Sequence, residues 1–170
     1  MNFRPVFSVI LLASLFLNAP AGGRELSAPE LNRAGMDALE KGNNETASEY
    51  FIGAIVLDPS NKYYCNNMAA SLMRRGKYPE AEKFLFHAIK IDGNYTRALS
   101  NMAVTLFHLG RYRESYSYYL RSMSADRTYT ESRFERGRVK SEIKKISKGK
   151  PEDRDLEKII DYLGDGDKRR

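Results

Sequence analysis

The fold is decided by residues 62–95, KYYCNNMAASLMRRGKYPEAEKFLFHAIKIDGNY. Apolar and small residues fall at helical spacing in two runs: Met68, Ala69 and Leu72, then Ala81, Phe84, Leu85, Ala88 and Ile89. Gly76 lies between the runs, where a glycine ends a helix because it adopts left-handed backbone readily. Pro79 suits the first turn of a following helix, since a backbone N–H in that turn would have no partner within the helix and proline has none. The stretch therefore predicts two helices joined by a tight turn.

The same pattern occurs once before and once after this stretch, at a constant spacing of 34 residues. Three slots repeat in all three units: Gly42, Gly76 and Gly110; Asp58, Asp92 and Asp126; and Ile55, Ile89 and Met123. Two small slots also repeat: Ala47, Ala81 and Ser115; and Ala54, Ala88 and Ser122. The sequence therefore predicts an all-α stack of three helix pairs, over residues 28–61, 62–95 and 96–129.

These units resemble the tetratricopeptide repeat (TPR) family, which has this period and small residues where its helices pack closely. The first unit carries the resemblance through Leu31, Ala34, Gly35, Ala38, Ala47, Phe51 and the closing Pro59. The chain departs from the family pattern because it has no tryptophan, and Gly93 and Arg127 replace the closing proline in the later units. The resemblance implies a helix-turn-helix solenoid with C-terminal capping helices.

The two ends of the chain differ from the repeats. Arg4, the apolar run 6–17 and the small residues Ala19 and Ala21 have the pattern of an export signal, so we expect a signal peptide over 1–21 and a short linker over 22–27. The alternative is an uncleaved membrane anchor, although the run is shorter than the roughly 20 residues that span a bilayer. We therefore expect an exported protein, periplasmic or secreted.

After the repeats, residues 130–147 predict a basic capping helix, and 148–170 a short terminal helix with a frayed tail. The formal net charge is +6, and residues 133–150 hold eight bases and two acids. Because the rest of the chain is nearly neutral, the charge argues against a nucleic-acid partner. The basic stretch is either a solvated capping face or a contact for an acidic partner or an anionic membrane surface.

Composition gives no support for an enzyme. One cysteine, Cys65, and two histidines, His87 and His108, are too few for a structural metal site, and no catalytic or phosphate-binding motif occurs. We therefore expect no catalytic, cofactor-binding or metal residues and no small-molecule substrate. Two triplets, Asn44-Glu45-Thr46 and Asn94-Tyr95-Thr96, match the acceptor pattern for N-glycosylation, which matters only in a eukaryotic host.

The TPR resemblance implies that the first helix of each unit lines a groove that holds a segment of another protein. Carried over by slot, the expected partner-binding residues are Asn32, Met36, Tyr63, Asn66, Met73, Arg74, Arg97, Asn101, Val104, Phe107 and His108. Phe107 is expected to be an exposed anchor for the partner. For Asn67 and Asn101 the alternative to a role in the groove is that they only bond the loop between units. The function predicted is a protein-binding adaptor or assembly factor; the alternatives are a chaperone of a secretion system and a helical-repeat RNA binder.

Overall fold

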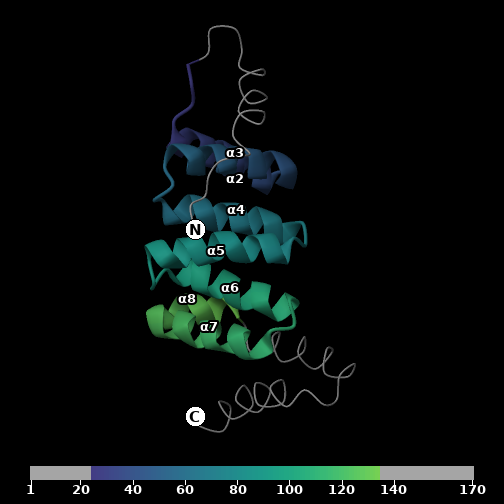
Figure 1. Ribbon diagram of the computed structural model, residues 1–170, viewed down its shortest axis with the longest axis vertical. Coiled ribbons are helices and arrows are strands. Elements are labelled where there is room, and N and C mark those ends of the chain that lie inside the picture. The colour runs from purple at the N-terminus through teal and green to yellow at the C-terminus, as the bar shows by residue number, and fades with distance from the viewer. Residues whose placement is uncertain (1–23, 135–170) are drawn as a thin grey trace.

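The computed structural model describes residues 24–134, and within this range the regular elements are all helices, whose pairs stack in chain order (Figure 1). Their bounds are α2 Ala28–Glu40, α3 Asn44–Leu57, α4 Lys62–Arg74, α5 Tyr78–Ile91, α6 Thr96–His108, α7 Tyr112–Ala125 and α8 Arg127–Arg133. The predicted all-α helical solenoid is confirmed. The signal peptide expected over 1–21 and the terminal helix expected over 148–170 lie outside the described residues, as does most of the basic stretch 133–150.

Each helix pair turns at a glycine whose backbone other residues rarely adopt. Gly42, Gly76 and Gly110 have φ of 79°, 70° and 75°, and they are the positive-φ residues of the described chain. In each turn the N–H of the next residue bonds the carbonyl four residues before the glycine at 2.9 Å, as from Lys77 to Leu72. These bonds satisfy carbonyl groups that the ending helix leaves without partners. The 34-residue glycine period is therefore a period of turns.

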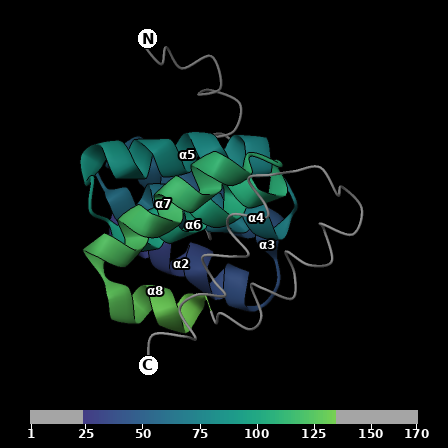
Figure 2. The same ribbon diagram turned by 90° about the horizontal axis from the view of Figure 1, so that it is seen from below.

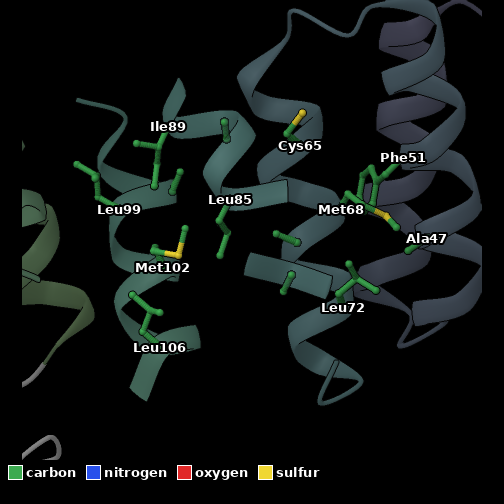
Figure 3. Close-up of a cluster of buried hydrophobic side chains, with 14 of the residues drawn as sticks. Ala47, Phe51, Cys65, Met68, Leu72, Leu85, Ile89, Leu99, Met102 and Leu106 are labelled. Carbon is green, nitrogen blue, oxygen red and sulfur yellow. The ribbon is translucent and has the colours of Figure 1, made fainter. Parts of the chain in front are cut away.

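Small residues let the helices approach one another closely. Ala47, Ala54, Ala81 and Ala88 are all fully buried, and the larger core side chains fill the space between units (Figure 3). Phe51 of α3 is fully buried and lies against Gly35 of α2. The repeated alanines therefore mark the contacts between helices, and the core runs through the stack.

Serine replaces alanine in the third unit, and each buried serine hydroxyl has a hydrogen-bond partner. The Ser122 hydroxyl lies 2.7 Å from the hydroxyls of Ser100 and of Thr130, and all three residues are fully buried. The Ser115 hydroxyl donates to the carbonyl of Ala103 at 2.7 Å. Because a buried hydroxyl is costly only when it has no partner, the stack tolerates these substitutions.

The last described helix follows α7 without the link that separates the earlier units. Residues 58–61 and 92–95 join those units, whereas Asp126 ends α7 and also caps α8, its side chain accepting from the Tyr129 N–H at 2.9 Å. The capping helix, predicted to begin at residue 130, therefore begins at Arg127. Its predicted continuation to residue 147 lies outside the described residues.

Candidate partner-binding face

The first helix of each unit contacts the first helix of the next, so α2, α4, α6 and α8 form a continuous surface, which we call the first-helix face. Figure 2 looks along the stack and shows α2 and α8 on the side opposite α5. The second helices, α3, α5 and α7, pack against the first helix of their own unit. The residues expected to bind a partner all come from α2, α4 and α6.

A ladder of side-chain amides joins the first helices of neighbouring units. The Asn67 Nδ2 donates to Asn32 Oδ1 at 2.9 Å, and the Asn101 Nδ2 donates to Asn66 Oδ1 at 2.9 Å. Arg133 of α8 extends the ladder, because its Nη2 donates to Asn101 Oδ1 at 2.7 Å. Asn67 and Asn101 therefore bond a neighbouring helix rather than the loop between units.

Burial divides the expected binding residues into two groups. Asn66 and Asn101 are only 5% and 8% exposed, and their amides are engaged with each other, so these two hold the units together instead of facing a partner. Met36 and Tyr63 are exposed to 45% and 52%, which makes them the large apolar side chains most open to contact on this face. Asn32 is half-buried, and its Nδ2 also approaches the Met36 sulfur at 3.7 Å.

Phe107 differs from the expectation of an exposed anchor. It is half-buried, and its ring meets the edge of Tyr112, the first residue of α7, with centroids 5.4 Å apart. His108 is exposed, and its ring stacks on Tyr78 of α5 with centroids 4.2 Å apart. Helical spacing alone missed both contacts because Tyr112 lies beyond the turn at Gly110 and Tyr78 belongs to the preceding unit. Met73 and Val104 are half-buried, and Met73 packs against the core.

Two arginines border the exposed part of the face. Arg97 lies over the ring of Tyr129 with its Cζ 6.0 Å from the centroid, and Arg74 Nη1 donates to the Leu39 carbonyl at 2.6 Å. Both arginines are exposed. Lys62, near Tyr63, is instead paired with Asp92, which raises the pKa of its ammonium group. These contacts hold Arg74 and Arg97 in place, and neither contact is with a carboxylate.

The charge of the face changes along the stack. Helices α4 and α6 contain no aspartate or glutamate, and α8 contains two arginines and one glutamate. Helix α2 carries three acidic residues, Glu30, Asp37 and Glu40, against one arginine. The face is thus acidic at its N-terminal end and basic over α4, α6 and α8, a pattern that attracts acidic ligands to the basic part.

Cys65 of α4 is a core residue. Cys65 is 1% exposed, and burial raises the pKa of its thiol to about 11, so it remains a neutral packing group. Among residues 24–134 no cluster of histidine, cysteine and carboxylate side chains could hold a metal ion. A search of the same residues for helices long and apolar enough to cross a membrane finds none.

The second helices expose apolar side chains that the sequence analysis did not single out. Phe86 of α5 is 60% exposed, and Val56, Leu57, Ile91 and Leu120 are exposed to between 39% and 57%. Phe86 follows Leu85, which belongs to the core stripe, so an apolar residue one position off that stripe was the available signal.

Comparison with known proteins agrees with the fold. The family model described as the coatomer epsilon subunit matches residues 55–141, which is half of the chain. No curated protein matches the chain. The structure of the second TPR of Spaghetti (RPAP3) bound to the HSP90 peptide SRMEEVD is 26% identical, with a TM-score of 0.58 over 59% of this chain and 93% of that one.

Two further solved structures are similar in fold. The Arabidopsis OM64 TPR domain is 20% identical with a TM-score of 0.59, covering 65% of this chain and 96% of that one. The Sgt2 TPR domain from Aspergillus fumigatus is 16% identical with a TM-score of 0.58, covering 86% and 85%. The repeat pattern, the glycine turns and these comparisons agree: the chain is a tetratricopeptide repeat protein and belongs to the family of the coatomer epsilon subunit.

Proposed function

We propose that this chain is a protein-binding adaptor that holds an acidic segment of a partner protein on its first-helix face. The observation that carries the proposal is the charge of that face: α4 and α6 contain no acidic residue, and Arg74 and Arg97 lie exposed at its edges. An acidic segment is attracted to these charges, and arginines at the edge of a binding face keep most of their hydration in a complex, so the attraction is not cancelled by desolvation.

Apolar anchors next to these charges support a peptide ligand. Met36 and Tyr63 expose about half of their surface, and a methionine and an aromatic side chain are common anchors at protein interfaces. Asn67 is half-buried and uses its amide nitrogen in the ladder, which fixes the direction of its carbonyl oxygen. A fixed amide of this kind can accept from the backbone N–H of an extended segment and so set its register.

The comparison structure supports the acidic character of the ligand. The peptide bound to the second TPR of Spaghetti, SRMEEVD, contains two glutamates and one aspartate. Some members of the TPR family clamp a C-terminal carboxylate with a lysine and two asparagines. In this chain Asn32 and Met36 replace the first lysine and asparagine, so the clamp is not complete. We therefore propose an acidic segment with apolar residues, without requiring a free C-terminus.

Export is part of the proposal, supported by the signal pattern of residues 1–21. The adaptor then works outside the cytoplasm, in the periplasm or as a secreted protein, where it helps to assemble or tether a larger complex. N-terminal sequencing of the exported protein should begin at Gly22. A full-length chain kept in the membrane would instead show an uncleaved anchor.

A site-specific crosslinking experiment tests the binding face. A photo-reactive phenylalanine is placed at Tyr63 on α4 or, as the matched control, at Phe86 on α5; the two positions are 52% and 60% exposed. Irradiation in cells should crosslink a partner from position 63 and not from position 86. Crosslinks from position 86 alone would move the interface to the second helices and reject the proposal.

A charge experiment then tests what the face recognises. The probe is SRMEEVD, compared with its neutral counterpart SRMQQVN, and the variants are Arg97→Gln and the control Lys83→Gln on the exposed side of α5. The acidic peptide should bind more tightly, and Arg97→Gln should reduce that difference while Lys83→Gln leaves it unchanged. Equal binding of both peptides would contradict the acidic ligand, and salt-dependent RNA binding lost in Arg97→Gln would favour the RNA-binding alternative.

A further inference from the structure

Two side-chain contacts join α6 to the capping helix α8. In the first, Arg97 of α6 lies over the ring of Tyr129 of α8. In the second, the amide oxygen of Asn101 of α6 accepts from Arg133 of α8. The two residues on α6 are four apart, and so are the two on α8, so each pair lies on one side of its helix. The contacts are therefore one helical turn apart, and each helix supplies one arginine.

Neutral groups hold both arginines in place. The Cζ of Arg97 lies 6.0 Å from the ring centroid, and an N–H of Arg133 donates to Asn101 Oδ1 at 2.7 Å. Arg75 and Arg111, in contrast, are paired with glutamates at distances between 2.6 and 2.9 Å. A guanidinium has several N–H donors. Among residues 24–134, Arg133 uses a single one in a hydrogen bond and Arg97 uses none, so both keep donors and charge for a ligand.

The acidic residues close to these arginines in the sequence are already engaged. Asp92 is paired with Lys62, and Glu131 is paired with Arg127 at 3.5 Å. The Asp126 side chain accepts a backbone N–H of α8 at 2.9 Å. Among residues 24–134 no ion pair involves either arginine of the two contacts, so their positive charge is positioned without being neutralised.

We propose that Arg97 and Arg133 form a subsite that binds a side-chain carboxylate of the partner segment between α6 and α8. Each oxygen of a carboxylate can accept from one guanidinium, and hydrogen bonds between two charged groups are the strong ones. Asn101 is 8% exposed and donates to Asn66, so the amide that holds Arg133 is fixed before a ligand arrives. Tyr129 and Asn101 are positioning residues, because they act on the ligand through the arginines.

The subsite makes α8 part of the binding face. None of the residues expected from the sequence to bind a partner comes from α8, and Arg133 is exposed at its last position. The inference rests on the proposed function and adds the place of an acidic residue of the segment. That place is at the opposite end of the first-helix face from α2, which carries three acidic residues against one arginine.

The experiment measures the binding of the peptides SRMEEVD and SRMQQVN to the full chain. The variants are Arg97→Gln, Arg133→Gln and the two together, and the control is Arg127→Gln, an exposed arginine of α8 that is paired with Glu131. A glutamine amide can still donate to Asn101 Oδ1, so Arg133→Gln removes the charge and keeps the contact. Thermal melts of each variant accompany the titrations.

Arg133→Gln should weaken binding of the acidic peptide about 3- to 10-fold and leave the neutral peptide unchanged, whereas Arg127→Gln changes neither. The double variant should lose less than the product of the two single effects, because both arginines hold the same carboxylate. In the unmodified chain, the acidic peptide should shift the Nε–H NMR signals of Arg97 and Arg133 and not that of Arg127.

Three results overturn the subsite and leave the proposed function standing: a preference for the acidic peptide that survives Arg133→Gln, single effects that multiply in the double variant, or a bound acidic peptide that shifts neither signal. Equal binding of both peptides by the unmodified chain rejects the proposed function itself, and the subsite with it. If Arg133→Gln melts far below the unmodified chain, the NMR signal of Arg133 decides the question, since it needs no substitution.

Discussion

The contact between Gly35 and Phe51 allows a direct test of how the first helix pair is packed. A Cβ added at Gly35 would lie 2.6 Å from Phe51 Cε1, 2.8 Å from Cδ1 and 3.1 Å from Cζ. Carbon atoms in contact lie about 3.5–4.0 Å apart, so the ring would have to move by about 1 Å. Phe51 is fully buried, and its neighbours are close-packed, so there is no free space to receive it.

Two effects compete in Gly35→Ala, and the packing effect should win. Alanine is favoured over glycine inside a helix by about 1 kcal/mol. Overpacking a core costs about 1–3 kcal/mol, and here the obstacle is an aromatic ring in a filled interior. We expect a net loss of about 1–2 kcal/mol in the free energy of unfolding, seen as a lower urea midpoint and as a Tm lower by about 4–15 °C.

The control is Gly93→Ala, because a Cβ at Gly93 meets nothing within 4 Å and its φ is ordinary. This variant should change stability by less than about 0.5 kcal/mol, or increase it slightly through the unfolded state. Phe51→Leu should lower the free energy of unfolding less in the Gly35→Ala variant than in the wild type, since the smaller side chain relieves the clash. If Gly35→Ala unfolds at the wild-type midpoint or above it, the close contact between Gly35 of α2 and Phe51 of α3 is wrong.

Four further outcomes follow from buried and titrating groups. Ser122→Ala removes both hydroxyl contacts of a buried serine and should cost about 1–2 kcal/mol in urea unfolding, although alanine is the residue of the earlier units; an unchanged midpoint would contradict the hydroxyl network. Thr105→Val should be neutral or stabilising, because its buried hydroxyl has no hydrogen-bond partner within residues 24–134, and a clear loss of stability would reveal one. Cys65 should react with a thiol reagent only after unfolding; rapid labelling of the native protein would show that it is accessible. The Ser27 hydroxyl and backbone N–H lower the pKa of Glu30 to about 2, so its contribution to stability is present above the unfolded value of 4.5 and is lost as the pH falls toward 2; Glu30→Gln should flatten the pH dependence of unfolding in that window.

Sequence alone was sufficient for the fold because the fold is periodic. The glycines at residues 42, 76 and 110 mark the turns, and each of them has the left-handed backbone that their spacing predicts. The alanines that recur at 34 residues are fully buried. These features depend on contacts between neighbouring helices, which a local pattern can encode.

The candidate site was less predictable because its side chains are positioned across units and turns. The spacing of Asn66 and Asn101 does not show that one amide donates to the other and that both are buried. The contact of Phe107 with Tyr112 likewise depends on the geometry of the turn between them. Met36 and Tyr63 are exposed, as the slot carry-over expected, because their contacts with neighbouring side chains leave about half of each side chain open to solvent.

The missing link before α8 changes the phase of the repeat. Helix α8 begins three residues before the 34-residue period would start it, and at 3.6 residues per turn this rotates its side chains by about 300° relative to the earlier first helices. Arg133 occupies the slot that holds Cys65 and Leu99, both buried, yet it is exposed and reaches Asn101. The shift at Asp126 therefore places Arg133, a charged residue, in a slot that the earlier units fill with core residues, and the 34-residue register of the three units is not kept in α8.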